Sequence, residues 1–467
     1  MRIRLCASLG ALCVALGAMP LPAQAAPDQA LARQLLDDLI ASNTAPSGGP
    51  DTRHAVGLLV DALRAEGFPE SDIHVVGISE ELPSLVVRYR SPDPKAGAVL
   101  MMAHIDVVEG LESDWSYPPY QATEEDGWIY GRGSTDNKAG VAMLVANFIA
   151  LHREGFAPDR DLILMLTADE ETNGLSANML GTTHRDLIAA DFALNTDGGG
   201  VIAGEDGAPL AFVMQTAEKV YVTYAFTASD PGGHSSLPKP DSPISAVSRA
   251  LVALEDYHFP INLNEISRGF FSNWSVVAPP EDRALLGAMA AYQPGDTEPE
   301  GLAANPYYNS LARTTCVATQ IAGGHAENAL PQTARAVVNC RVLPQESAES
   351  VEQRLAALAA PHGVQVETVF PYMASPPSLP REDVTGPVTA LAQRHFGNIP
   401  VIPELSTGAT DGAFIRNAGI PVYGISAILE DPADIRAHGM DERIAISAYQ
   451  RSVAYWYDLA KAVSTLD

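Results

Sequence analysis

The chain has 467 residues, of which 46% are hydrophobic and 18% are charged, with 37 Gly and 35 Pro. This composition is that of a globular protein and excludes wholesale disorder, a collagen-like repeat and a disulfide-dense miniprotein. The length indicates two or three domains. The formal net charge is −28, and because such a surface repels phosphate, no nucleic-acid partner is expected.

Residues 1–25 are typical of a signal peptide. A basic start precedes an apolar run from Leu5 to Met19, and the small-residue sequence A-Q-A ends at Ala25. The apolar run is too short to span a bilayer, and no later stretch reaches that length. We therefore expect a periplasmic or secreted protein that is cleaved near Ala25 and has no stable membrane insertion.

Cleavage at that point leaves two of the four cysteines, Cys316 and Cys340. Both lie in strand-like runs, at 315–322 and 334–343, which a hairpin could bring together. Two interpretations remain open. The cysteines pair in an oxidising compartment, or they are two small buried hydrophobic residues.

The chain from residue 26 to 217 alternates helix-like and strand-like segments. Helical periodicity occurs at 28–42, 52–66 and 138–153, and short apolar runs suited to strands occur at 84–90, 98–104, 161–167 and 191–196. This alternation predicts an α/β sheet with helices on its faces. Polar residues follow these strands directly, where open α/β sheets place their sites.

The pattern changes over residues 218–374, where the segments predict four antiparallel strands and two helices. The strands are expected at 219–228, 315–322, 334–343 and 364–369, and the helices at 243–257 and 348–360. Residues 259–312 lack clear periodicity and contain several prolines, so we expect an irregular excursion there. The α/β pattern resumes over 375–467, with helices at 383–396 and from 447 and strands at 401–404 and 420–425. One α/β domain interrupted by an inserted α+β domain fits this order.

Five polar clusters lie after the predicted strands or in loops: 104–106, 131–138, 169–171, 197–200 and 438–442. Each cluster alone has an ordinary structural explanation, such as a turn or a solvated acidic pair. Together they could converge on one edge of the sheet. Two histidines with several carboxylates suit Zn²⁺ or a similar divalent ion, and there are enough ligands for two ions that share a bridging carboxylate.

The motifs H-x-D-V-V, G-R-G-x-x-D-x-K, D-E-E-x-x-G, D-G-G and H-G-x-x-E occur in this order from residue 104 to 442. This series resembles the two-zinc exopeptidases and amidohydrolases that include glutamate carboxypeptidase, carnosinase-type dipeptidases, aminoacylase and carboxypeptidase S. The resemblance covers nearly all of the mature chain. It implies a mixed sheet flanked by helices, as in zinc exopeptidases, and an inserted lid domain that often supports homodimerisation.

The resemblance also implies a metal-ligand set. Asp136 would bridge two divalent ions, His104 and Asp197 would complete one site, and Glu171 and His438 would complete the other. Zinc is the expected metal, with cobalt or manganese as alternatives. The family further has a cis peptide after the bridging residue, which is Asp136-Asn137 in this chain.

Three residues are implied to act in catalysis. Glu170, beside a ligand, would be the general base, and Asp106 would orient the His104 ring. His234, in the sequence G-G-H-S-S, would help to stabilise the oxyanion, and in the family this histidine often reaches the active site of the dimer partner.

Substrate binding is implied for Asn328, Arg341, Gly408 and Thr410. An arginine offers two donors to a free carboxylate, which would restrict cleavage to the C-terminal end of a substrate. Two alternatives stay open. Arg341 could be a strand residue with a local ion pair, and the Gly-rich loop around Gly408 could be only a connection.

The sequence thus predicts an exported metal-dependent hydrolase of the amide bond next to a free C-terminal carboxylate, acting on short peptides or N-acyl amino acids. One alternative is an aminopeptidase with the same two-metal site. Another is an exported binding protein that has lost catalysis.

Overall fold

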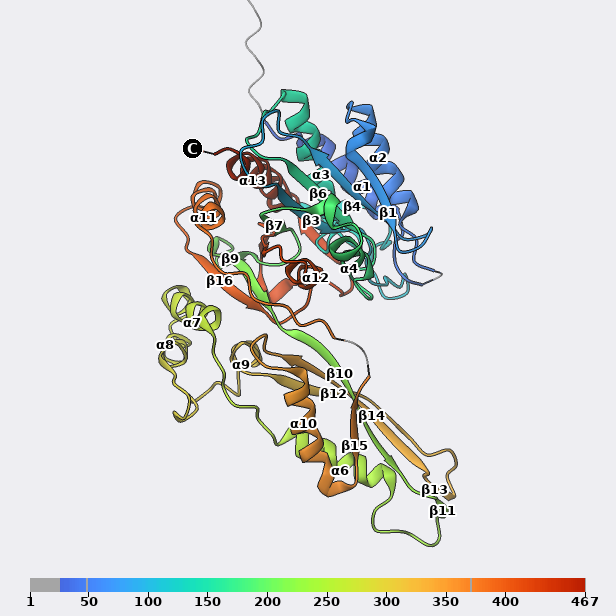
Figure 1. Ribbon diagram of the computed structural model, residues 1–467. Helices are drawn as coiled ribbons and strands as arrows, with labels where there is room; N and C mark the ends of the chain where they lie inside the picture. Colours follow the sequence, from blue (N-terminus) through green and yellow to red (C-terminus); the bar gives the residue numbers. More distant parts are fainter. Residues whose placement is uncertain (1–25, 48, 370–371, 467) are drawn as a thin grey trace, which may run out of the picture.

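The computed structural model describes residues 26–47, 49–369 and 372–466. The predicted signal peptide, residues 1–25, lies outside the described residues. The described chain forms a large layered α/β unit and an elongated second unit that extends away from it (Figure 1). Within these described ranges, we find no helix both long and apolar enough to span a bilayer.

The large unit is built on a ten-stranded mixed sheet. Strands β3, β6, β7 and β17 form its parallel centre, and β9 pairs in parallel with β16. The order is β1 (Ile73–Gly77), β2 (Pro83–Tyr89), β6 (Leu162–Thr167), β3 (Val99–His104), β7 (Phe192–Asn195), β17 (Val422–Gly424), β9 (Pro209–Glu218), β8 (Gly200–Ala203) and β18 (Leu429–Glu430), with β16 (Val401–Ser406) beside β9.

Helices cover both faces of this sheet, because alternate residues of its central strands point into two separate cores. Val99 and Met101 of β3 belong to one core, and Leu100 and Met102 belong to the other. The first core contains α1 (Gln29–Ala41), α2 (Arg53–Ala65), α3 (Lys138–Glu154), α11 (Glu382–Phe396) and α13 (Ile446–Ser464). The second contains α4 (Leu175–Thr182), α5 (Arg185–Ile188) and α12 (Gly412–Asn417). The predicted mixed sheet flanked by helices is therefore confirmed.

Short elements complete this unit. A three-stranded sheet has the order β19 (Arg443–Ala445), β5 (Trp128–Tyr130) and β4 (Thr123–Glu125). Three short 3₁₀ helices lie at Glu70–Asp72, Ala360–His362 and Pro432–Asp434, the second of them in the elongated unit.

The elongated unit contains the predicted four-stranded antiparallel sheet with two helices. The strand order is β12 (Thr315–Gly323), β14 (Thr333–Val342), β10 (Val220–Ser229) and β15 (Gln365–Thr368). Helices α6 (Pro243–Glu255) and α10 (Ala348–Ala359) pack on the sheet around one core. The small strands β11 (Gly233–His234) and β13 (Ala329–Leu330) pair at the end farthest from the large unit (Figure 1). We call this unit the lid.

A disulfide joins Cys316 of β12 to Cys340 of β14, and the two residues lie directly opposite each other in the strand register. The sequence left two interpretations open, and the structure shows the one in which the two cysteines pair.

The expectation of an irregular excursion over residues 259–312 is wrong. The segment contains α7 (Glu265–Val277), α8 (Arg283–Ala291) and α9 (Pro306–Ala312). These helices pack with β9 and β16 of the large unit in a core of their own that includes Phe270 and Phe271. We call this segment the wing. The prolines that suggested irregularity lie mostly between the helices, and a capping box of Asn264 and Ser267 is the start signal that was overlooked.

The chain enters the lid through a single residue. β9 ends at Glu218 and β10 begins at Val220, so only Lys219 lies between them. Its buried side chain donates to the main-chain oxygen of Arg313 at 2.8 Å, and burial lowers the pKa of its ammonium group to about 7.

Candidate metal centre and active site

Three of the five predicted metal ligands lie at or just after the ends of central strands of the sheet. His104 ends β3, Glu171 follows β6, and Asp197 follows β7. Asp136 immediately precedes α3, and His438 comes from the loop between β18 and β19. Because parallel strands end at the same edge of a sheet, this topology gathers side chains that are more than 300 residues apart in sequence.

The carboxylate of Asp136 lies between the two histidines. Its Oδ1 is 3.0 Å from His104 Nε2, and its Oδ2 is 3.2 Å from His438 Nε2. Asp197 is 3.9 Å from His104, and Glu171 is 2.9 Å from His438. The structure thus brings together both predicted triads, with Asp136 offering a different oxygen to each.

The charge of this cluster fits divalent cations. Burial raises the pKa of Asp197 to about 7 and, helped by neighbouring carboxylates, that of Glu170 well above its usual value. The pKa of Asp136 is lowered despite its burial, because both histidines hydrogen-bond to it. Buried carboxylates that repel one another are stabilised by bound cations, and the groups His104–Asp136–Glu171 and His104–Glu170–Asp197 have ligand-type atoms close enough to hold an ion.

The His104 ring is oriented for metal binding by the main chain. Its Nδ1 is 3.0 Å from the main-chain oxygen of Asp106 and 3.6 Å from the Asp106 carboxylate. With Nδ1 donating to that carbonyl, Nε2, which faces Asp136, is the nitrogen that would bind a metal ion after losing its hydrogen. Asp106 therefore contacts the ring mainly through its carbonyl, which the sequence did not anticipate.

The Asp106 carboxylate instead holds the loop that carries Glu170 and Glu171. It accepts hydrogen bonds from both main-chain nitrogens, at 3.1 and 3.0 Å. Asp169, to which the sequence assigned no role, fixes the other end of this loop by accepting from the nitrogens of Leu175 and Ser176 at the start of α4. The position of the predicted general base is thus set by two buried carboxylates.

The Gly-rich loop after β16 is fixed by a buried ion pair. Glu218 and Arg416 are 2.5 Å apart, and Glu218 also accepts from the main-chain nitrogen and the hydroxyl of Thr410, both at 3.0 Å. The Gly408 nitrogen donates to Ser406. Both the hydroxyl and the main-chain nitrogen of Thr410 therefore hold the loop in place, and its main-chain oxygen accepts from the Ala413 nitrogen. Glu218 was missed in the sequence because nothing local marks its partners.

Arg341 lies at the end of β14 nearest the large unit. Its guanidinium is 4.6 Å from the centre of the Tyr221 ring and 3.5 Å from the main-chain oxygen of Thr407. In the part of the chain that the structure describes, Arg341 forms no ion pair. Arg341 is therefore a strand residue, as one interpretation held, but without the local ion pair, and its guanidinium lies beside the Gly-rich loop.

His234 and Asn328 lie at the opposite end of the lid from Arg341. The Ser235 nitrogen donates to the main-chain oxygen of Asn328, and His234 pairs with Ala329 across β11 and β13. Both residues are exposed at the far tip (Figure 1). Within one chain, the structure does not bring these two predicted residues to the metal cluster.

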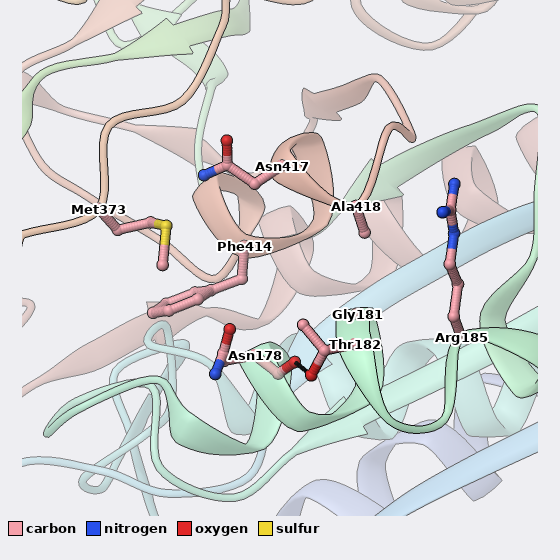
Figure 2. A pocket seen from close by; sticks show the side chains of 8 residues that line it. All are labelled: Asn178, Gly181, Thr182, Arg185, Met373, Phe414, Asn417 and Ala418. Carbon is pink, nitrogen blue, oxygen red and sulfur yellow. Dashed lines mark hydrogen bonds between the residues drawn. The ribbon is translucent and has the colours of Figure 1, made fainter.

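A cavity of about 270 Å³ lies between α4 and α12 on the outer side of the sheet (Figure 2). Asn178, Phe414 and Asn417 face it, and Met373 closes one side. None of the predicted site residues lines it. Gly174 sits at the start of α4 with φ +61°, where a side chain would collide with the Phe414 ring, so the close packing of these helices depends on that glycine.

The predicted cis peptide is present at Asp136-Asn137.

The chain is similar in sequence to named proteins of other organisms. It is 28% identical over 391 residues to human N-fatty-acyl-amino acid synthase/hydrolase PM20D1, covering 80% of this chain and 75% of the relative. It is 29% identical over 288 residues to carboxypeptidase S of Saccharomyces cerevisiae, covering 58% and 49%.

The solved structures agree on the fold. The M20 family metallo-carboxypeptidase Sso-CP2 from Sulfolobus solfataricus superposes with a TM-score of 0.71 at 18% identity, covering 93% of this chain and 99% of that one. The model of peptidase family M20/M25/M40 matches residues 100–462. The protein therefore belongs to the peptidase family M20/M25/M40.

Proposed function

We propose that the protein is a two-metal hydrolase that cleaves the amide bond next to a free C-terminal carboxylate. The observation that carries this proposal is the placement of Asp136, whose two oxygens face His104 and His438 at 3.0 and 3.2 Å. Bound ions would supply Lewis-acid activation of water and of the substrate carbonyl. Zinc is the proposed metal, because two histidines and three carboxylates form a ligand set that suits it.

The residues of the chain would divide the remaining work. Glu170 takes the proton of the attacking water and passes it to the leaving nitrogen. Arg341 binds the free carboxylate of the substrate beside the Gly-rich loop. His234 of a second copy donates to the oxyanion.

N-acyl amino acids are the proposed substrate class, with short peptides as the competing one. The similarity to N-fatty-acyl-amino acid hydrolases supports this choice. Ile435 and Met440, which flank His438 in sequence, are each 60% exposed. An apolar acyl chain passing His438 would find contacts there that a polar dipeptide would not use.

Export and dimerisation are part of the same proposal. Residues 1–25 support export through their signal-peptide pattern. β12 is an edge strand of the lid sheet, and its Val317 and Ile321 are 61% and 58% exposed. A second copy that covers this edge would pair its open hydrogen-bonding groups.

The test measures release of free amino acid from N-acyl amino acids of increasing chain length and from matched dipeptides. Each substrate is also offered as its C-terminal amide, and each reaction is repeated with a chelator and after adding back Zn²⁺, Co²⁺ or Mn²⁺. We expect chelator-sensitive cleavage of free acids only, with activity rising with acyl length.

Other outcomes would redirect the proposal. Cleavage of C-terminal amides that is abolished by a blocked N-terminus would identify an aminopeptidase. No cleavage by a metal-loaded sample would indicate a binding protein. Cleavage of dipeptides alone would reassign the substrate class but keep the two-metal chemistry. Analytical ultracentrifugation of the mature chain tests the dimer separately.

A further inference from the structure

A buried ion pair lies behind the metal cluster and joins two motifs that are far apart in sequence. Arg132 Nη1 donates to Glu442 Oε2 at 2.8 Å, and the side chains are only 2% and 0% exposed. Arg132 precedes Asp136 by four residues, and Glu442 follows His438 by four residues. Neither residue belongs to the two ligand triads described above.

The Glu442 carboxylate is used almost entirely to hold the loop that ends at Asp136. Oε2 accepts from the Gly133 nitrogen at 3.0 Å, besides Arg132. Oε1 accepts from the nitrogen and hydroxyl of Thr135 at 2.8 and 2.9 Å and from the Asp136 nitrogen at 3.0 Å. Both oxygens therefore act only as acceptors, and the last of these donors belongs to the predicted bridging ligand itself.

Arg132 extends this network to two more loops. Its Nη2 donates to the main-chain oxygen of Glu109 at 3.1 Å and to that of Gly439 at 2.9 Å. Its guanidinium also lies 4.9 Å from the centre of the Trp115 ring. Glu109 is on the loop that follows His104, and Gly439 is next to His438. One side chain thus ties together the loops that carry three of the five predicted ligands.

We propose that Arg132 and Glu442 are positioning residues that set the spacing of His104, Asp136 and His438, and thereby the affinity for both metal ions. This inference rests on the proposed two-metal function. The reason lies in the acceptor set: five donors converge on one carboxylate, and only a group with acceptors at both oxygens can satisfy them. Glutamine at this position would turn an amide NH₂ toward either Arg132 and Gly133 or Thr135 and Asp136, so donors would face donors.

The test compares Glu442→Gln with a matched control, Asp434→Asn. Asp434 is on the same loop and accepts from Arg436 and Arg443, so the control removes the same charge from a partly exposed arginine pair that does not touch residues 133–136. Metal affinity is measured on the mature protein by Co²⁺ titration against a competing chelator, followed by the absorption spectrum of the bound ion. We expect Glu442→Gln to weaken both binding steps about 10- to 100-fold and to change the Co²⁺ spectrum, and Asp434→Asn to leave both within about twofold.

A second variant covers the case in which Glu442→Gln does not fold. Thr135→Val removes a single hydroxyl donor from the same carboxylate, and we expect it to fold and to weaken Co²⁺ binding in the same direction by a few-fold. Unchanged affinity and spectrum in a folded Glu442→Gln protein, or in Thr135→Val when Glu442→Gln is unfolded, would overturn the inference. If the wild-type protein itself does not bind two ions, the proposed function fails instead, so the two failures are distinguishable.

Discussion

The predicted site residues fall into two groups that the fold treats differently. The ligands and Glu170 lie at strand ends or on loops of the large unit. Two of these loops are held by buried acidic side chains: Asp106 and Asp169 hold the loop of Glu170 and Glu171, and Glu442 holds the loop of Asp136. His234 lies on the two-residue strand β11, and Asn328 lies just before β13, at the exposed tip of the lid that is farthest from the large unit. The first group comes together within one chain, whereas the second would reach a metal-ligand cluster only where the tip meets another copy.

This difference indicates that a single chain is sufficient to form the metal-ligand cluster but not to bring His234 and Asn328 to it. Rigid loops held by several hydrogen bonds give the fixed geometry that metal binding requires. An exposed tip has few contacts to fix it, so its contribution to catalysis would have to come from docking. The predictions below test that division, beginning with the largest expected effect.

Replacement of the predicted base, Glu170, tests the group that lies within one chain. Glu170→Gln is expected to lower kcat by about 10²- to 10⁴-fold, because the attacking water loses its proton acceptor. Metal content, measured by atomic emission, should stay at the wild-type level. Glu205→Gln, at an exposed position, serves as the control, and a near-normal kcat in Glu170→Gln would remove the assignment.

Removal of the tip histidine tests the other group. His234→Ala is expected to lower kcat about 100-fold through loss of one oxyanion donor. Mixing it with Glu170→Gln should restore about one quarter of the wild-type rate, since half of randomly formed dimers would contain one intact composite site. If His234 acted within its own chain, the mixture would be as inactive as its components.

Arg341 lies between the two groups and is expected to affect substrate binding. Arg341→Ala should raise KM about 10- to 100-fold for free acids, because a charged hydrogen-bonding partner of the substrate is lost. Arg335→Ala, an exposed arginine on the same strand, is the control. Equal effects of the two variants would show that Arg341 does not contact the carboxylate.

The disulfide is expected to have the smallest effect on activity. A Cys316→Ser/Cys340→Ser double variant should lose about 2–4 kcal/mol of unfolding free energy, measured by urea denaturation. Because the bond lies outside the metal-ligand cluster, and because pairing with β10 still holds Arg341, which adjoins Cys340 in sequence, kcat/KM should stay within about twofold. A large loss of activity in the folded double variant would mean that lid geometry is less rigid than its sheet pairing implies.

The sequence predicted the strands that end at the site and the residues that follow them, because strand periodicity and polar residues are both local signals. It did not predict the roles of Glu442 and Glu218. Their partners lie about 310 and 190 residues away in the chain, and only the fold brings such residues together. Glu442 belongs to a recognised motif, whereas Glu218 carries no local signal at all.

The wing was missed for a different reason. Its helices are short and separated by proline-containing connections, and they bury their apolar faces against β9 and β16 rather than against the lid. The start of α7 carries a local signal, the capping pair Asn264 and Ser267, and the helix has apolar residues at Phe270 and Phe271. The prolines nearby favour irregular structure and so conceal this signal. Helix starts marked by a capping residue should therefore be weighed even within proline-containing segments.

The single-residue crossing at Lys219 leaves almost no length of chain between β9 and β10. A residue has two soft torsion angles, so any rotation of the lid at this crossing would turn about a short pivot. In any rotation about a pivot, displacement grows with the distance from it. Arg341, whose neighbour Val342 pairs with Val220 beside the pivot, would stay next to the Gly-rich loop through such a motion. His234, at the end of the arm, would sweep the widest arc, so small changes of angle at Lys219 become large changes in where the tip arrives.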